Sequence, residues 1–381
     1  MRKKGGENRK IGYSFLAASI LALTLWLCGS KGLAYTAAVA AGLAMPEGAY
    51  ASVVEQLQME SAPESTAVEE TAAVLQQDHA NGMEARTAAA EKSADLSAVP
   101  ADIKALIAVA ESKTDNAKKL GNIVEKDYNK NGMTHSYQNV RVKNNSGKSL
   151  NIEAVLGQKP ELLVKDKTKP AVLIFHTHTT ESYQILERKQ YSSKDAARSN
   201  NEGENMIRVG AEIAKQLEAA GYSVIHDKTV HDTSYSGAYD RSRETLKRHL
   251  AEHPEIQVVL DVHRDAIHQA GGNKIKPTAQ FNGKKAAQVM IITGVEGGNV
   301  KGFPNWEKNL RFALQLQRKM EGLYPGLTRP VLFSQRKYTM DLHPCNVLLE
   351  MGSDVNTLDE AVYSGRLVGN ALVSLLEEYT K

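Results

Sequence analysis

Two strings of histidines and carboxylates follow apolar segments of the sequence. Residues 176–181 read His-Thr-His-Thr-Thr-Glu after the apolar run 171–175, and residues 261–265 read Asp-Val-His-Arg-Asp at the end of another run. Catalytic zinc is bound by imidazole and carboxylate groups, and three protein ligands leave its fourth position for water. We therefore predict that Zn²⁺ is bound by His178, Glu181 and His263. The H-x-x-E spacing alone is also typical of loop residues that only hydrogen-bond to one another.

A third apolar run, residues 346–349, ends at Glu350. A carboxylate beside a catalytic metal can take a proton from water and later deliver it to a leaving amine. We predict this acid–base role for Glu350, and the alternative is a structural carboxylate in a helix cap or an ion pair. Neighbours of the metal ligands are predicted to orient a ligand or to contact substrate: His176, Asp261, Arg264 and Asp265.

Strands and helices are predicted to alternate in the region that contains these residues. Short apolar runs predict strands at 171–175, 222–225, 256–262, 287–293 and 346–350. Apolar residues at helical spacing predict helices at 206–217, 241–250, 306–314 and 368–375. Such alternation predicts an α/β fold with a mainly parallel sheet covered by helices on both faces. Ligand sites of such sheets lie at the carboxyl ends of the strands, where the three strings would meet.

The N-terminal thirty residues have the pattern of a membrane anchor. Residues 1–10 are rich in Lys and Arg, and residues 11–30 carry no charge. About 20 apolar residues span a bilayer, and a basic flank stays on the cytoplasmic side. We predict a cytoplasmic tail at 1–10, a single transmembrane segment at 11–30 and an extracytoplasmic remainder. The alternative is a cleavable signal peptide, with a small-residue cleavage site at 38–40.

The rest of the chain divides by composition. Residues 47–100 are acidic and polar with no sustained apolar face, which predicts a disordered linker. Residues 101–165 are predicted to form a small lead-in region with a helix near 103–109 and strands at 140–142 and 150–155. Residues 166–381 are predicted to form the catalytic domain.

Charge and cysteine content exclude other classes of protein. The formal net charge is +3 from 47 basic and 44 acidic residues, which is too balanced for a nucleic-acid-binding surface over the whole chain. The two cysteines, Cys28 and Cys345, lie far apart in the sequence. A disulfide framework and a cysteine-based zinc site are therefore excluded, which leaves histidines and carboxylates as metal ligands.

Four strings closely resemble the stage II sporulation protein P family: residues 176–183, 224–229, 261–266 and 349–352. The resemblance runs from about residue 165 to the C-terminus, and the predicted anchor and linker fit it too. It implies a peptidoglycan hydrolase of endospore-forming bacteria, related to zinc-dependent N-acetylmuramoyl-L-alanine amidases and having endopeptidase activity as well. The implied partners are stage II sporulation proteins D and M, and the implied place of action is the septal intermembrane space during engulfment.

The resemblance to the amidases also implies roles for single residues. It makes His178 and His263 metal ligands and Glu350 the catalytic glutamate. The amidases take their carboxylate ligand from the start of the first helix, where this chain offers Glu202 and Glu204, whereas the H-x-x-E spacing points to Glu181. The glycine-rich loop of the amidases is replaced here by threonines.

Two other functions remain compatible with the sequence. A zinc carboxypeptidase acting on free peptides could also use an H-x-x-E pair. A wall-binding scaffold without activity could keep the fold and use the polar strand ends for recognition only.

Overall fold

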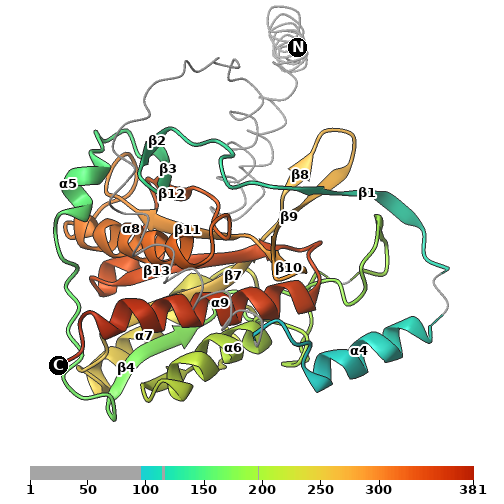
Figure 1. Ribbon diagram of the computed structural model, residues 1–381, viewed down its shortest axis with the longest axis horizontal. Helices are drawn as coiled ribbons and strands as arrows, with labels where there is room; N and C mark the ends of the chain where they lie inside the picture. The colour runs from blue at the N-terminus through green and yellow to red at the C-terminus, as the bar shows by residue number, and fades with distance from the viewer. Residues whose placement is uncertain (1–95, 114–115, 196) are drawn as a thin grey trace, which may run out of the picture. The chain divides into compact units, whose positions relative to one another are not determined.

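The main sheet of the protein contains all five strands predicted in the α/β region. The computed structural model describes residues 96–381 except 114, 115 and 196, and within these residues the sheet has eight strands. Their order is β2-β3-β12-β11-β13-β7-β4-β6 (Figure 1). The strands are β2 (His135–Tyr137), β3 (Val140–Asn145), β4 (Pro170–Phe175), β6 (Ser223–His226), β7 (Val258–Asp265), β11 (Val289–Gly294), β12 (Val331–Ser334) and β13 (Asn346–Ser353). Only the pairs β2–β3 and β11–β13 are antiparallel, so the predicted mainly parallel sheet is confirmed.

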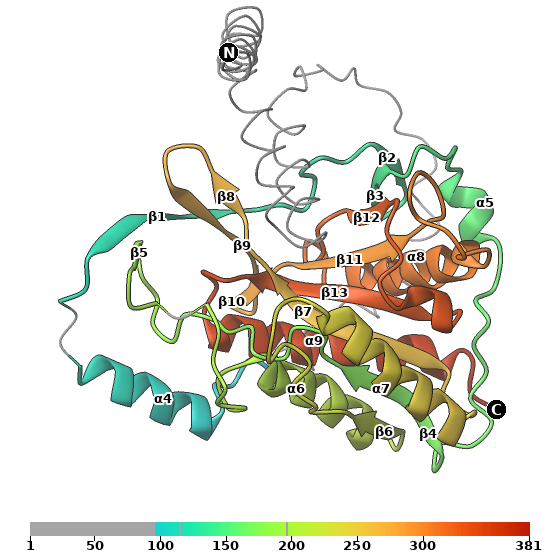
Figure 2. The ribbon, with the colours of Figure 1, turned by 180° about the vertical axis from the view of Figure 1, so that it is seen from behind.

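Helices cover both faces of this sheet. One face is covered by α6 (Met206–Ala219), α8 (Trp306–Leu323) and α9 (Leu358–Glu377), which share a large apolar cluster with Val258 and Val262 of β7. The other face is covered by α7 (Ala238–Glu252) (Figure 2). Leu246 of this helix packs on Leu173 and Phe175 of β4. The predicted α/β class with helices on both faces is therefore confirmed.

The alternation of side chains along β7 decides which residues reach which face. Val258, Leu260 and Val262 are buried against α6, α8 and α9, whereas Val259 is buried against α7. Each such side chain stabilises the fold by about 1.5–3 kcal/mol when it leaves water. Because successive side chains of a strand point to opposite faces, the odd-numbered Asp261 and His263 face the α7 side.

Capping residues fix where two helices begin. Asn205 Oδ1 accepts a hydrogen bond from the backbone N–H of Ile207 at the start of α6. Thr357 and Glu360 form a reciprocal capping box at the start of α9. Caps of this kind stabilise a helix by about 1 kcal/mol, and the α6 cap sets the register with which this helix faces the sheet.

A second sheet was not predicted. Its strands, in the described residues, are β1 (Lys119–Lys126), β5 (Gln190–Ser192), β8 (His268–Gln269), β9 (Asn273–Phe281) and β10 (Lys284–Ala287). The pair β1–β9 is parallel and joins segments about 150 residues apart in sequence. This sheet therefore connects the lead-in region to the segment that follows β7.

Two of the three elements predicted in the lead-in region are correct, and the strand at 140–142 is β3. The helix α4 (Ala101–Glu111) covers the predicted helix, but the strand predicted at 150–155 is the short helix α5 (Ile152–Leu156). Asn151 caps α5 by accepting a hydrogen bond from the N–H of Ala154, and this cap favours a helical turn over an extended run. A short 3-10 helix, η1 (Met340–Leu342), precedes β13.

The predicted N-terminal segments lie mostly outside the described residues. The tail at 1–10, the transmembrane segment at 11–30 and the linker up to residue 95 all fall there. Within the part of the chain that the structure describes, no helix combines the length and apolar character needed to cross a membrane.

Candidate metal centre

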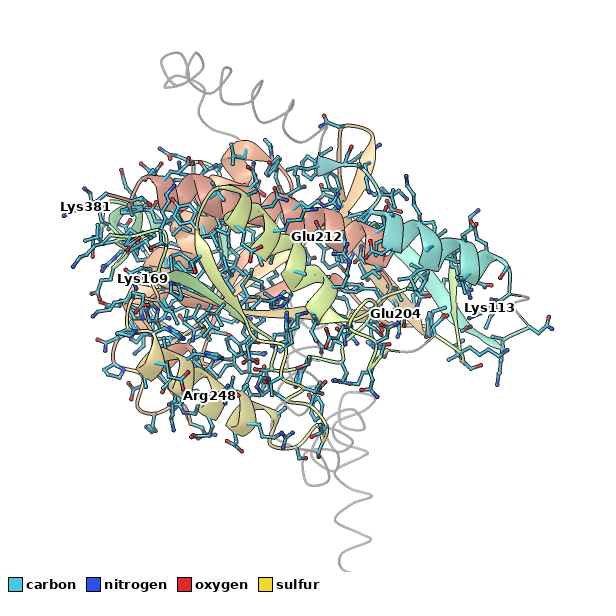
Figure 3. The ribbon with its side chains drawn as sticks, turned by 90° about the horizontal axis from the view of Figure 1, so that it is seen from below. Lys113, Lys169, Glu204, Glu212, Arg248 and Lys381 are labelled. Carbon is cyan, nitrogen blue, oxygen red and sulfur yellow. The ribbon has the colours of Figure 1, made fainter. Side chains whose placement is uncertain are left out.

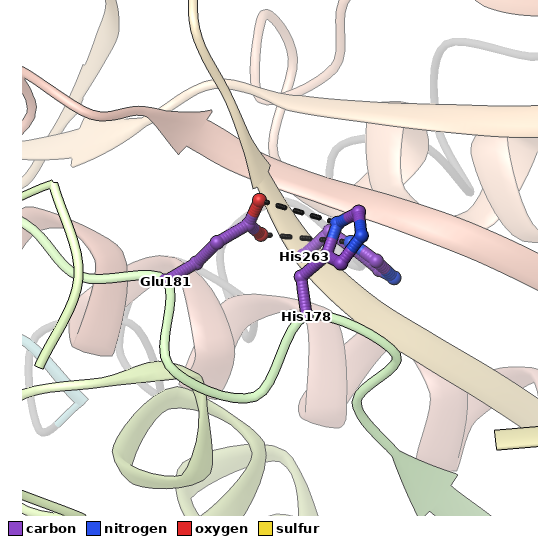
Figure 4. Close-up of side chains that lie close together, drawn as sticks. All are labelled: His178, Glu181 and His263. Carbon is purple, nitrogen blue, oxygen red and sulfur yellow. Dashed lines mark ion pairs between the residues drawn. The ribbon is translucent and has the colours of Figure 1, made fainter. Parts of the chain in front are cut away.

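Two histidines and one glutamate converge at the carboxyl ends of β4 and β7. His178 and Glu181 lie in the loop after β4, and His263 lies on β7 (Figure 4). His178 Nδ1 is 3.5 Å from Glu181 Oε1, and His263 Nδ1 is 3.5 Å from Glu181 Oε2. One ligand atom from each residue lies within 4.8 Å of the others, and all three residues are buried. The structure thus brings together the three residues for which zinc binding was predicted.

The loop after β4 is fixed to β7 by a buried carboxylate. Phe175, the last residue of β4, pairs with Asp261 in the parallel register of the two strands. Asp261 accepts hydrogen bonds from the Thr177 backbone N–H at 2.9 Å and from the Thr177 hydroxyl at 2.7 Å. These bonds hold the start of the loop, so His178 emerges on the same side of the sheet as His263.

Asp261 also orients the ring of His263. Nε2 of His263 lies 2.8 Å from Asp261 Oδ1, which leaves Nδ1 facing Glu181. Burial lowers the pKa of His263, but the carboxylates of Asp261 and Glu181 outweigh it and hold the pKa well above its ordinary value. The surroundings of this ring therefore favour positive charge.

Arg264 holds Glu181 in place. Its backbone N–H donates to Glu181 Oε2 at 3.2 Å, and its guanidinium donates to the carbonyls of Ser182 and Ala197. Burial raises the pKa of Glu181, but Arg264, His178 and His263 more than compensate and hold it well below its ordinary value. Arg264 thus positions the carboxylate and keeps it ionised.

Glu350 lies beside His263 on the neighbouring strand. Glu350 of β13 pairs with His263 of β7 in the parallel register. Its Oε2 is buried and has no hydrogen-bond partner among the described residues. Burial and the carboxylate of Asp265 raise the pKa of Glu350 to about 8. Asp265 itself accepts a hydrogen bond from Arg329 at 2.8 Å and is not one of the residues that meet at Glu181.

His176 faces the opposite side of the sheet from His178. Its Nδ1 lies 2.8 Å from the carbonyl oxygen of Val262, and its Nε2 lies 2.9 Å from Nε2 of His226. A Cβ on Gly210 of α6 would come within 2.7 Å of the His176 ring, so this glycine makes room for the pair. Burial lowers the pKa of His176 to about 3 and that of His226 to about 4. His176 therefore belongs to a neutral buried pair against α6.

The two alternative carboxylates have other partners. Glu204 precedes α6 (Figure 3). It accepts hydrogen bonds from Ser199 and Asn201. Glu202 is exposed, and its Oε2 lies 3.4 Å from Nζ of Lys228. Glu181 is thus the carboxylate that meets both histidines in this structure.

Three tyrosines beside the histidines were not predicted. The ring of Tyr239, at the start of α7, lies 5.5 Å from that of His178 and 6.4 Å from that of His263. Tyr235 stacks on His178 at 5.1 Å, and Tyr338 stacks on Tyr239 at 4.7 Å. No local signal in the sequence marks these residues, because their position depends on how α7 and the segment before η1 pack on the sheet.

The sequence comparisons assign this chain to a family. The family model of Stage II sporulation protein P matches residues 53–373. The chain belongs to the stage II sporulation protein P family. Among curated proteins, Stage II sporulation protein P of Bacillus subtilis (strain 168) is 34% identical over 205 residues, which are 50% of this chain and 47% of the relative. The aligned part is thus about half the length of the curated relative.

Solved structures with similar folds include members of the N-acetylmuramyl-L-alanine amidases. Ami1 from Mycobacterium abscessus is 15% identical and covers 55% of this chain and 99% of its own, with a TM-score of 0.32. The CwlD amidase from Clostridioides difficile, solved with the GerS lipoprotein, is 11% identical. The match covers 55% of this chain and 98% of the amidase chain, with a TM-score of 0.33.

Proposed function

We propose that this member of the stage II sporulation protein P family is a zinc-dependent peptidoglycan hydrolase. In this proposal it cleaves the amide bond between muramic acid and L-alanine and, as an endopeptidase, peptide bonds of the stem. The observation that supports it best is the buried group of His178, Glu181 and His263, beside which Glu350 lies with an unpartnered oxygen. The chain acts from a membrane anchor at residues 11–30, together with stage II sporulation proteins D and M during engulfment.

The donor set fits zinc. A tetrahedral zinc ion with bonds of about 2.0–2.1 Å places its ligand atoms ~3.3 Å apart. His178 Nδ1 lies 3.5 Å from Oε1 of Glu181 and His263 Nδ1 lies 3.5 Å from Oε2, so each histidine faces one oxygen of the carboxylate. One ligand atom from each of the three residues lies within 4.8 Å of the others, so small shifts of the side chains would bring them to that spacing. The carboxylates that raise the pKa of His263 would equally favour a divalent cation at this place.

Zinc and Glu350 would have different roles in the hydrolysis. Zinc held by His178, Glu181 and His263 would supply a Lewis acid for the scissile carbonyl and lower the pKa of water. Glu350 takes a proton from the attacking water at its carboxylate and returns it to the leaving amine. Burial and Asp265 raise the pKa of Glu350 above that of an ordinary carboxyl group, which makes its carboxylate a stronger base and lets it hold the proton until the amine leaves.

The chain's other residues keep these groups in position. Asp261 holds the His263 ring with Nδ1 toward Glu181, and Arg264 fixes the Glu181 carboxylate. Tyr239 packs against both histidine rings and limits their rotation. Catalysis depends on such preorganisation because the reacting groups then need no rearrangement in the transition state.

Digestion of purified sacculi by the full chain tests the proposal. We expect release of stem peptides that stops on treatment with a chelator and returns when zinc is added. Free N-terminal L-alanine on the released peptides, without new reducing ends, indicates amidase cleavage. Release of the terminal residue alone would indicate a carboxypeptidase, and binding of sacculi without release would indicate a scaffold; either result contradicts the proposal.

A further inference from the structure

A second group of metal-binding side chains lies at the end of α7. The end of the helix and the residue that follows it read His249-Leu250-Ala251-Glu252-His253, in which two histidines flank a glutamate at the spacing H-x-x-E-H. Glu252 is the last residue of α7 and His253 is its C-cap. Residues three and four positions apart share one face of a helix, so these side chains are neighbours. One ligand atom from each of His249, Glu252 and His253 lies within 4.8 Å of the others.

His249 is already oriented as a metal ligand would be. Its Nε2 lies 2.8 Å from Asp227 Oδ2, in the loop after β6. Metal-binding histidines usually donate one ring N–H to a carboxylate, which leaves the lone pair of the other nitrogen for the metal. The other nitrogen, Nδ1, is buried and has no hydrogen-bond partner among the described residues. A bound cation would satisfy this nitrogen.

The other two side chains are accessible from solvent. Glu252 is exposed and His253 is half-buried, with its ring stacked on that of His249 at 6.4 Å. His253 also caps the carboxyl end of α7, where the helix dipole favours positive charge. Figure 3 shows Arg248, next to His249, at the outer surface of this helix. A metal ion can therefore approach the group from the side of Glu252 and His253, with the buried Nδ1 of His249 as the innermost ligand atom.

This group is separate from the candidate metal centre. Tyr239, at the start of α7, contacts His178, and His249 follows ten residues later. At a rise of 1.5 Å per residue these ten residues span about 15 Å along the helix axis.

We propose that His249, Glu252 and His253 form a second zinc site that is peripheral to the candidate metal centre. Two imidazoles and one carboxylate suit zinc, with water in the fourth position. By linking the last turn of α7 to Asp227 through His249, the bound ion stabilises the packing of α7 on the sheet. The site does not depend on the proposed hydrolase activity.

Zinc content of the full chain, purified without a histidine tag, tests this proposal. We expect two zinc ions per chain after dialysis against buffered zinc. The double variant Glu252→Gln and His253→Ala should bind one ion and hydrolyse sacculi normally, because both side chains lie outside the core. The matched variant His178→Ala should also bind one ion and lose hydrolysis.

A second variant checks the role of Asp227. Asp227→Asn should weaken zinc binding at α7 about 10–100-fold, the usual loss when a carboxylate that orients a metal-bound histidine is replaced. Added zinc should raise the Tm of His178→Ala but not the Tm of the variant that also carries Glu252→Gln and His253→Ala. Equal zinc content and affinity in the wild type and in the Glu252→Gln, His253→Ala variant would overturn the proposal, whether or not the chain is a hydrolase.

Discussion

His176 and His178 are two residues apart in one loop, yet their surroundings differ in kind. Both ring nitrogens of His176 have partners, the carbonyl of Val262 and the ring of His226. His178 faces the carboxylate of Glu181 and lies beside the ring of His263. One ring is thus enclosed among neutral groups, whereas the other borders a carboxylate. The comparison teaches that the nearby carboxylate distinguishes a candidate ligand from a packed histidine.

The pKa shifts on the two sides of the sheet have opposite signs. Burial lowers the pKa of His176, which has no carboxylate in hydrogen-bond contact. Burial also lowers the pKa of His263, but the carboxylates of Asp261 and Glu181 raise it more, so the net shift is upward. The α6 face therefore stabilises neutral imidazole, and the α7 face attracts cations.

The largest effect should come from removing a histidine on the α7 face. His178→Ala or His263→Ala should lose the zinc at this centre and lower hydrolysis of sacculi at least ~10³-fold, because metal catalysis is worth several kcal/mol of the barrier. His176→Gln is the matched control, and it should keep the zinc at this centre and most of the activity. Elemental analysis and peptide release measure the two quantities. The comparison fails if His176 proves essential while His178 tolerates replacement.

A smaller effect is expected when the hydrogen bond that orients the ring of His263 on the α7 face is weakened. Asp261→Asn keeps the shape of the side chain but weakens its hold on His263 Nε2. Zinc affinity at the candidate centre should fall about 10–100-fold. Competition with a chromophoric chelator measures this affinity. Unchanged affinity would show that Asp261 serves only to fix the loop through Thr177.

On the α6 face the expected effect is on stability. Gly210→Ala would place a Cβ 2.7–2.8 Å from the rings of His176 and His226, and such overpacking costs about 1–3 kcal/mol of unfolding free energy. Gly322→Ala in α8 is the control, because its Cβ would meet nothing closer than 3.8 Å. Chemical denaturation of both variants compares them. Equal stability would contradict the tight fit of the histidine pair.

A further effect on the α6 face concerns pH. His176 and His226 have folded-state pKa values of about 3 and about 4, below the ordinary 6.5. Below pH 6.5 the unfolded chain therefore binds protons that the folded chain does not, so stability falls as pH drops from 6.5 towards 4. Each histidine contributes at most about 1.4 kcal/mol per pH unit. Replacing both histidines by Gln should make the unfolding free energy depend less on pH. An unchanged slope would contradict the low pKa values of the two histidines.

Local patterns in the sequence predict the parts of the fold that depend on one segment at a time. The apolar runs that become β4, β7 and β13 are recognisable because each is buried along its whole length, and their polar ends predict where His178, His263 and Glu350 lie. Their roles as ligands and acid–base group stay predictions. Strand alternation does not separate His176 from His178, because residues two apart would share a face. The two rings reach opposite sides because β4 ends at Phe175 and the chain turns after it.

Features that join distant segments could not be predicted in this way. The pairing of β1 with β9 has no signal in either strand alone, because exposed and half-buried residues alternate irregularly in β1. Tyr239 reaches His178 only through the packing of α7 on the sheet. The helix α5 was mistaken for a strand because a five-residue element is too short for its periodicity to identify it.

Hydrolysis of purified sacculi by Glu350→Gln, with zinc measured in the same sample, tests the central claim most directly. Gln keeps the shape of the side chain but cannot accept the proton. The variant should keep its zinc and its affinity for sacculi while peptide release falls about 10²–10⁴-fold, the usual scale of general acid–base catalysis. Near-normal release with a lowered Tm would show that Glu350 is a structural carboxylate and would contradict the proposed mechanism.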